Sequence, residues 1–569
     1  MANRREFLQR GLSAFFLGLS RDPHWLPHLR VPAAARALDS GLWRTRPLAA
    51  IDDDPASIDV HGLPFAAGFF GDAFSSTQIP FHHPETQYPG GVAPAPDEEV
   101  EVAIVGGGLS GLTTAYLLRH RHPVVFELHE RFGGVAMGET WRDTSFSMGS
   151  AYFIAPDKGS VLEGLYHELG LDKVYRFAGT DADLVEFAGT IESDFWKGTG
   201  LPDAQVEAFR RYADVVQNYA DKSYPDIPLV ADRDNAWILR LDQKSLKDDI
   251  AEKVGLPIPR LLAAGVQGYC HSSFGAGWEE ISAAAGWNFI AAEEYGRWIC
   301  PGGNAYVADV LWQKLVRAYS HGHLDRLRAG TRAVEVAVQP DGRVRVVYRT
   351  PQGTFRSLLA RRVVLACSKH ICKYLIPGLQ QLDARKYEAM QQINTNAYIV
   401  ANVLLEKPVA LDFYDLFLLR DGSLAAPASQ AKPEYAVTDV VSGHYAARTA
   451  DERSVLTLYW PLPWQHGLFT LIVENAWRSY ADRLATDLRR TLALLSIEPA
   501  AVKQVRMTRW GHAMPIARVG LLSSGTIEHL RRPFRDNVFF VNQDNWALPA
   551  FETCLLEAHT FAARIDASL

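Results

Sequence analysis

Four residues between positions 106 and 127 have the types and spacing that bind a dinucleotide. Gly106, Gly108 and Gly111 form a G-x-G-x-x-G pattern, and Glu127 follows 21 residues after the first glycine. In such a pattern the first glycine permits a tight turn, the second admits a pyrophosphate close to the backbone, and the third lets a helix pack on a strand. A carboxylate at Glu127 can accept hydrogen bonds from ribose hydroxyls.

The surrounding sequence predicts the elements that must position these residues. Residues 99–105 read as a strand, 106–108 as a turn, 109–120 as a helix and 122–128 as a second strand. The N-terminus of a helix that follows such a turn offers free N–H groups to phosphates. The pattern therefore predicts an α/β, Rossmann-like domain.

The residues just downstream indicate which dinucleotide is bound. Arg131, Gly133 and Gly134 follow Glu127 with the spacing E-x-x-x-R-x-G-G. This resembles the continuation found in the FAD-binding flavin amine oxidase superfamily, where the glycine pair passes near the phosphates and the flavin. The resemblance implies FAD as cofactor and an FAD-binding domain joined to a mixed α+β substrate domain, with a spermidine-dehydrogenase-like branch as one option.

Later segments extend the resemblance over most of the chain after residue 99. The strand around Val334 resembles the one whose backbone meets the adenine, and residues 366–368 (Ala-Cys-Ser) replace the family's Ala-Thr-Pro. The resemblance places Asp544 near the ribityl or phosphate region of FAD. It places Glu552 and Thr553 at the start of a helix facing the pyrimidine end of the flavin, with Thr553 in place of the usual glycine.

The chemistry implied by the resemblance is oxidation of a small molecule, with an amine as the favoured substrate, by hydride transfer to the flavin N5 atom. Trp546 is predicted to form a wall of the substrate site. His512 is predicted to be a polar group of that site, although a structural role is equally compatible with its sequence context. Two adjacent glutamate pairs, at 279–280 and 293–294, are interpreted as surface charges.

Two other functions remain open from the sequence. One is a desaturase or isomerase that acts on an apolar substrate with the same FAD frame, and the other is a flavin-binding protein without turnover. The electron acceptor is open as well, between oxygen and a periplasmic carrier. The strand expected after residue 395 has no lysine before Lys407, whereas many family members hold a water near N5 with a lysine there, so a dehydrogenase is favoured over an oxidase.

The bulk composition excludes several classes of protein. The 569-residue chain has a net charge of -7, which gives no reason to expect a nucleic-acid partner, and no apolar run reaches the ~20 residues of a transmembrane helix. Its five cysteines form no C-x-x-C pair, and His82-His83 have no recognisable partner, so no metal site is predicted.

The N-terminus resembles a twin-arginine export signal. Arg4-Arg5 precede a short apolar stretch, and small residues at 33–37 offer a cleavage site, so residues 1–37 are predicted to be a signal and the protein periplasmic or exported, with a cytoplasmic location as the alternative. Residues 38–98 read as an extended lead-in lying over the surface. The FAD-binding domain is assigned to 99–190, 301–395 and 505–569, and the substrate domain to 191–300 and 396–504.

Overall fold

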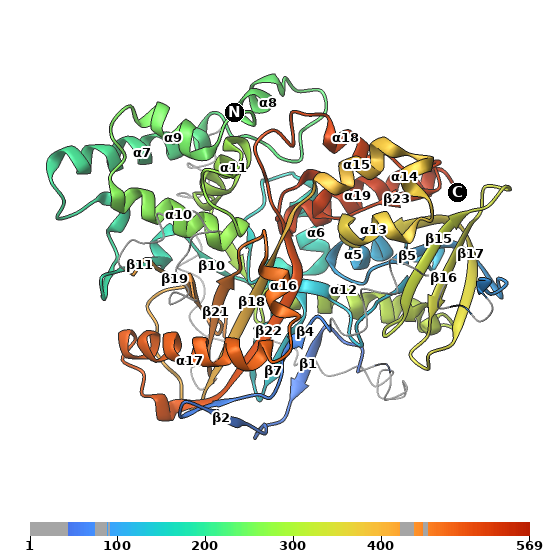
Figure 1. Ribbon diagram of the computed structural model, residues 1–569, viewed down its shortest axis with the longest axis horizontal. Helices are drawn as coiled ribbons and strands as arrows, with labels where there is room; N and C mark the ends of the chain where they lie inside the picture. The colour runs from blue at the N-terminus through green and yellow to red at the C-terminus, as the bar shows by residue number, and fades with distance from the viewer. Residues whose placement is uncertain (1–41, 43, 74–87, 89–90, 421–436, 448–452) are drawn as a thin grey trace.

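Two large sheets and a helical region make up the described part of the chain (Figure 1). The computed structural model describes residues 42, 44–73, 88, 91–420, 437–447 and 453–569. The predicted class is confirmed: a Rossmann-like α/β domain is combined with a mixed α+β domain. The predicted export signal and His82-His83 lie outside the described residues.

A seven-stranded sheet carries the strands predicted on either side of the glycine turn. Its order is β14-β6-β5-β17-β16-β15, with β23 paired to β17. The strands β14, β6, β5, β17 and β23 run parallel, whereas β15, β16 and β17 form an antiparallel meander. The bounds are β5 Glu98–Val105, β6 Val124–Phe126, β14 Leu327–Arg328, β15 Arg332–Val338, β16 Val344–Arg349, β17 Phe355–Leu365 and β23 Val538–Phe540.

Helices α5 (Leu109–Leu117), α12 (Asn304–Tyr319), α19 (Phe551–Ala567) and α6 (Val161–Leu169) pack together against this sheet and share one apolar core. The predicted helix from 109 to 120 ends earlier, at Leu117, and a 3-10 turn follows. His122, the residue before Pro123, takes a left-handed conformation with φ of 46° and ends that 3-10 turn at Arg121.

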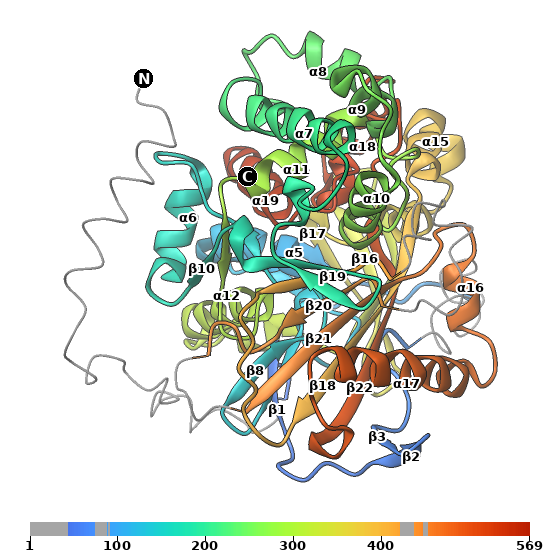
Figure 2. The same cartoon turned by 90° about the vertical axis from the view of Figure 1, so that its left-hand side faces the viewer.

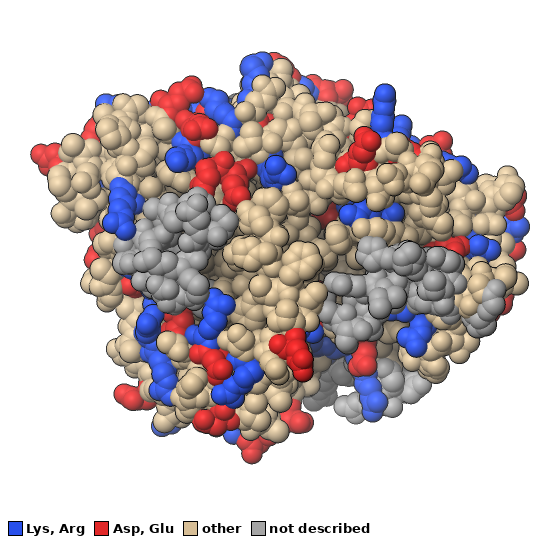
Figure 3. Space-filling view, viewed as in Figure 1, with Lys and Arg blue, Asp and Glu red and all other residues tan. Residues whose placement is uncertain are grey.

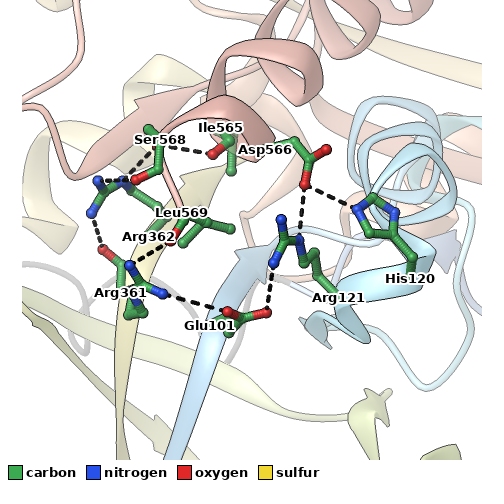
Figure 4. A network of polar contacts seen from close by, with 9 residues as sticks. All are labelled: Glu101, His120, Arg121, Arg361, Arg362, Ile565, Asp566, Ser568 and Leu569. Carbon is green, nitrogen blue, oxygen red and sulfur yellow. Dashed lines mark hydrogen bonds and ion pairs between the residues drawn. The ribbon is translucent and has the colours of Figure 1, made fainter.

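The C-terminal end of α19 is tied to the 3-10 turn after α5 and to strand β17 (Figure 4). Asp566 accepts hydrogen bonds from Arg121 at 2.8 Å and contacts His120 at 2.9 Å. Arg361 and Arg362 of β17 donate to the carbonyl oxygens of Leu569 and Ser568. These contacts fix the far end of a helix whose N-terminus faces the functional site described below.

A ten-stranded sheet forms the second layer, in the order β12-β11-β19-β20-β21-β18-β22-β3-β2, with β4 paired to β22. Its long central strand β18 confirms the strand predicted after residue 395. Helices α16 (Gly467–Leu471) and α17 (Ala476–Leu494) cover one face of it. The strand bounds are β2 Ile58–Val60, β3 Leu63–Phe65, β4 Phe70–Gly71, β11 Asp183–Phe187, β12 Thr190–Glu192, β18 Thr395–Leu405, β19 Asp415–Leu418, β20 Asp439–Ser442, β21 Ser454–Pro461 and β22 Val502–Pro515.

A helical region lies above the ten-stranded sheet (Figure 2). It shares a large apolar core with the second face of the parallel sheet. Its helices are α7 Asp203–Asp221, α8 Ala236–Leu241, α9 Leu246–Val254, α10 Arg260–Phe274 and α11 Ala283–Glu293. A second group of short helices lies beside β15 and β23: α13 Lys369–Leu375, α14 Leu379–Leu382, α15 Ala384–Gln392 and α18 Thr526–Arg531.

The N-terminal stretch is more ordered than the predicted surface lead-in, and this prediction is wrong for residues 48–71. Strand β1 (Leu48–Ile51) pairs with β7 (Gly138–Trp141), and β2, β3 and β4 join the ten-stranded sheet. Leu63 and Phe65 have no exposed surface. Alternating burial in such short strands is hidden by the many Pro, Gly and Asp residues around them.

The remaining small strands form two three-stranded sheets, β1-β7-β8 and β10-β13-β9. Their further bounds are β8 Thr144–Ser147, β9 Phe153–Ile154, β10 Arg176–Ala178 and β13 Arg297–Ile299. None of the helices in the described ranges has the length and apolar character needed to span a bilayer. On the face shown in Figure 3, acidic and basic side chains are interspersed.

Candidate active site

A cavity of ≈ 1970 Å³ extends from the glycine turn after β5 to the inner faces of β18, β19, β20 and β21. It is lined by the parallel sheet at one end and by the ten-stranded sheet and the helical region at the other. We call the first part the glycine end and the second part the acidic chamber. The two ends differ in how the chain builds them.

At the glycine end, backbone packing leaves no room for side chains at two of the predicted glycines. Gly106 has φ of +112°, and a Cβ on Gly111 would lie 1.8 Å from the carbonyl oxygen of Gly106. Helix α5 therefore packs directly on the turn. Its N-cap is Gly108, which supplies no side-chain hydrogen bond, so the first-turn N–H groups remain available to an anion.

The second pair of predicted glycines lies against the first turn. Gly133 donates its N–H to the carbonyl of Gly107 at 2.8 Å, and Gly108 and Gly133 form a β-bridge. Gly133 and Gly134 have φ of +116° and +55°, a region that side chains disfavour. Gly106, Gly108, Gly133 and Gly134 all line the cavity, which fits a pyrophosphate close to bare backbone.

Glu127 lies at the cavity edge, where the sequence predicts a ribose contact. Its two carboxylate oxygens accept the N–H groups of Gly107 at 2.7 Å and His129 at 2.8 Å. Burial raises the pKa of this carboxyl, and the two backbone hydrogen bonds oppose that shift. Each oxygen keeps lone pairs for a further donor, so adjacent ribose hydroxyls fit this position.

Arg131 also lines the cavity, but most of its donors serve the protein. It donates to the carbonyl of Gly138 at 2.9 Å and contacts the sulfur of Met148 at 3.1 Å. Val334 points its side chain into a small apolar cluster with Tyr88 and Val347, whereas the residues before it, at 331–333, line the cavity.

The C-terminal segment brings two predicted acids to the cavity. Asp544 accepts the N–H of Lys369 at 2.8 Å, and Glu552, in the first turn of α19, accepts the N–H of Ile154 at 2.7 Å. Burial raises the pKa of Glu552 to about 7. Thr553 is fully buried and does not line the cavity, and its hydroxyl has no hydrogen-bond partner within the described ranges.

The structure corrects the predicted role of Trp546. Its indole N–H donates to Glu557 at 2.9 Å, and the Arg531 guanidinium lies 4.6 Å from the ring centroid. Arg531 also forms an ion pair with Glu557 at 2.8 Å. Trp546 does not line the cavity, because its indole is held against Glu557 and Arg531.

His512 does line the cavity, at the end of β22. Its Nδ1 contacts the Thr395 hydroxyl at 2.7 Å, and its ring stacks on His370 with centroids 4.2 Å apart. Burial lowers the pKa of His512, so the imidazole is neutral at neutral pH. A neutral imidazole fixed by one hydrogen bond can orient a ligand without adding charge.

The acidic chamber is lined by aromatic side chains that sequence reasoning missed. Tyr398 and Tyr459 meet edge to face, with centroids 5.9 Å apart and an interplanar angle of 80°. The Tyr459 hydroxyl donates to the Gly149 carbonyl at 2.6 Å, and the Tyr398 hydroxyl donates to the Ser272 carbonyl at 3.2 Å. Because their polar ends are occupied, these residues present ring surface to the cavity.

One arginine in the chamber is bound by two acids. Arg297 is 2% exposed and forms ion pairs with Asp183 at 2.7 Å and Glu293 at 3.4 Å. Tyr152 and Tyr269 donate their hydroxyls to the same oxygen of Glu293, at 2.9 and 3.1 Å. The interpretation of the 293–294 pair as surface charge is wrong for Glu293, which these contacts hold against the cavity, whereas Glu294 is exposed.

Two further acids in the chamber form no ion pair with any residue that the structure describes. Asp415 is 4% exposed, and its Oδ1 has no hydrogen-bond partner within the described residues. Asp439, on the neighbouring strand, accepts a hydrogen bond from the Thr438 hydroxyl at 2.6 Å. Burial raises the pKa of Asp439 to about 7, against its hydrogen bonds. Burial and the charge of Asp439 raise the pKa of Asp415 well above its usual range, and the charge of Arg297 opposes that shift.

In the described ranges, no group of three or more His, Cys, Asp or Glu is arranged to hold a metal ion. The sequence signal of the chamber's acids is weak: Asp183, Asp415 and Asp439 are single acids at strand starts in segments far apart in the chain. Only the pairing of β11 with β19, and of β19 with β20, brings them together.

Comparison with known proteins identifies the class. A family model for flavin-containing amine oxidoreductases matches residues 109–565, and the chain therefore belongs to this family, whose members bind FAD. Gly106, Gly108, Gly133, Gly134 and Glu127 fit FAD, because they combine close backbone, free helix N–H groups and a carboxylate at the required places.

Individual proteins are similar to this chain in sequence or in fold. Oxidoreductase PigB of Serratia sp. (strain ATCC 39006) is 23% identical over 523 residues, 83% of this chain and 76% of that protein. Cyclohexylamine oxidase from Brevibacterium oxydans IH-35A superimposes with a TM-score of 0.59 and 17% identity, covering 82% of this chain and 99% of that one. Putrescine oxidase bound to putrescine also gives a TM-score of 0.59 at 17% identity, covering 82% and 99%.

Proposed function

We propose that this protein oxidises an amine whose cationic nitrogen binds in the acidic chamber. The observation that carries the proposal is the imbalance of buried charge there. Asp183 and Glu293 form ion pairs with one guanidinium, that of Arg297, whereas neither Asp415 nor Asp439 forms an ion pair within the described residues. Buried carboxylates of this kind are costly until a cation joins them.

The aromatic side chains suit the same ligand. The faces of Tyr398 and Tyr459 border the chamber near Asp439, and an ammonium over such a face is stabilised by the ring quadrupole. The names of the solved relatives, a cyclohexylamine oxidase and a putrescine oxidase, support amines as the substrate class. PigB carries only the general description of an oxidoreductase.

Bound FAD supplies an acceptor for the hydride that leaves the carbon next to the nitrogen. The residues of this chain then have two tasks, to orient the amine and to hold the proton that the ammonium must lose. Asp439, with a pKa of about 7, is suited to hold that proton. The ring surfaces exclude water, so the proton passes to the carboxylate rather than to solvent and leaves the neutral amine that hydride loss requires.

The experiment is an anaerobic screen of the purified flavoprotein, in which loss of flavin absorbance reports reduction. Monoamines and diamines are compared with neutral alcohols and apolar polyenes of similar size. The proposal expects bleaching by amines alone. Bleaching by a polyene alone would favour the desaturase alternative, and no bleaching by any compound would favour a flavin-binding protein without turnover.

We further propose that the reduced flavin passes its electrons to a carrier rather than to oxygen. The support is that β18 brings no lysine to the cavity, where many family members use one to hold a water near the flavin N5. The residues of β18 that line the cavity are Tyr398 and Val400, and Lys407 follows the end of the strand in an exposed position. Rapid reoxidation of the reduced protein by air in a stopped-flow experiment would contradict this. Export through the twin-arginine signal is proposed on the sequence of residues 1–37 alone, and it would place the carrier in the periplasm.

A further inference from the structure

Two cysteines lie in contact beside the glycine end of the cavity, where the FAD is expected to bind. Cys367 follows β17, Cys372 lies in α13, and their sulfur atoms are 3.6 Å apart. The Cys372 thiol also donates to the carbonyl of Cys367 at 3.3 Å. Cys372 is fully buried, whereas Cys367 lines the cavity together with Ala366 and Ser368.

All five cysteines of the chain lie in the described part, and this is the one sulfur–sulfur contact among them. A disulfide needs a sulfur separation of about 2.05 Å, so side-chain rotation must close about 1.5 Å. Cys554 lines the same cavity without a sulfur neighbour among the described residues, and it therefore provides an internal comparison.

We propose that Cys367 and Cys372 are a redox-active pair that hydrogen peroxide converts to a disulfide. One thiolate of the pair attacks a peroxide oxygen, the O–O bond breaks, and the sulfur becomes a sulfenic acid while hydroxide leaves and takes up a proton as water. The second sulfur then attacks the sulfenic sulfur, and a second water leaves. Two thiols and one peroxide give one disulfide and two waters, so two electrons pass from sulfur to oxygen.

The local charges favour the first step. Burial opposes ionisation of Cys372, but its contact with Cys367 and the charge of Lys369 lower the pKa of the Cys372 thiol. The same contact, followed by burial, raises the pKa of Cys367. The pair therefore holds one proton tightly and releases the other more readily, which supplies the nucleophile that peroxide chemistry needs.

Backbone hydrogen bonds connect the loop that holds Cys367 to the glycine end of the cavity. The carbonyl of Cys367 accepts a hydrogen bond from Asn542 at 2.8 Å, and the N–H of Lys369 donates to Asp544. The carbonyl of Ala366 lies against the Gly106 turn, where a Cβ on that glycine would lie 2.7 Å from it. Closing the disulfide pulls on this loop, so oxidation is expected to weaken retention of FAD.

The test uses the FAD-loaded protein, treated with hydrogen peroxide, quenched with an alkylating reagent and digested with trypsin. Cleavage after Arg362, Lys369 and Lys373 places the two cysteines in separate peptides, residues 363–369 and 370–373. The expected product is a linked pair of these peptides, two hydrogens lighter than their sum and released by dithiothreitol. Cys554 is expected to show no such link.

Two single variants sharpen the result. In Cys372→Ser, Cys367 is expected to stop at a sulfenic acid that a 1,3-dione captures, and in Cys367→Ser the roles reverse, with flavin absorbance confirming that each variant is folded. Alkylated thiols at both positions after peroxide, whatever the state of Cys554, would overturn the proposal. Over-oxidation of either cysteine in the unmodified chain without the linked peptide would overturn it too.

Discussion

The two ends of the cavity recognise their ligands by different means. The glycine end uses backbone, a helix N-terminus and one carboxylate, drawn largely from residues 106–134. The acidic chamber uses side chains from β11, α11, β13, β18, β19, β20 and β21, which span residues 183–461. The first can therefore be recognised in a short stretch of sequence, whereas the second exists only once the sheet has formed.

The largest expected effect is at the glycine end. Gly111→Ala puts a methyl group into the Gly106 carbonyl, so α5 and the turn must move apart. We expect the purified variant to retain less than about a tenth of the FAD of the unmodified protein, a loss above ~1.4 kcal/mol in binding. Flavin absorbance per protein measures this.

Gly164→Ala is the matched control, because Gly164 is exposed on α6 and a Cβ there meets no atom within 4 Å. This variant is expected to keep its FAD and to gain about 0.5–1 kcal/mol in stability. Equal FAD content in the two variants would break the claim that close backbone holds the cofactor.

The next effect belongs to the chamber. Asp415→Asn removes a buried carboxylate with an unpartnered oxygen, and we expect KM for the best amine to rise about 10- to 100-fold, as for the loss of a charged hydrogen bond. Steady-state kinetics with an artificial acceptor measures this. Asp412→Asn, at an exposed position three residues earlier, is the control and should leave KM unchanged. If both variants match the unmodified protein, the chamber does not bind the cation through Asp415.

Stability against pH sharpens the same contrast. The pKa of Asp439 is raised in the folded state from 3.8 to about 7, so the folded protein binds more protons than the unfolded chain between those values. Its contribution therefore favours folding at low pH and is lost as pH rises from about 4 through 7. We expect Asp439→Asn to reduce the fall in melting temperature of the substrate-free flavoprotein over that window. If the melting temperature of the variant fell by the same amount, folding would not raise the pKa of Asp439, and this part of the account would be wrong.

The smallest effect on activity is expected at Trp546. Trp546→Phe leaves a buried oxygen of Glu557 without its indole donor and should cost about 1–3 kcal/mol in stability. KM for the amine should stay within twofold, because the ring does not line the cavity. A large rise in KM, measured beside the melting temperature, would restore the prediction made from the sequence.

These contrasts explain what the sequence can predict. The fold class follows from Gly106, Gly108, Gly111 and Glu127, because a turn and a helix N-terminus are local features with fixed spacing. The family and the cofactor follow from the resemblance carried by Arg131, Gly133 and Gly134 just downstream. Asp415 and Asp439 are invisible at that level, since a lone acid at a strand start has no spacing to recognise. Glu293 was misread because adjacent glutamates near a helix end usually face water, whereas here Arg297 and two tyrosines draw one of them inward.

The central claim is that the chamber binds a cationic nitrogen through its unpaired acids. A crystal structure of the FAD-loaded protein with a bound amine inhibitor tests it most directly. The account predicts the amine nitrogen within about 3 Å of a carboxylate oxygen of Asp415 or Asp439, the distance of a charge-assisted hydrogen bond. An amine nitrogen placed elsewhere in the cavity, with both carboxyls in contact with protein groups alone, would contradict it.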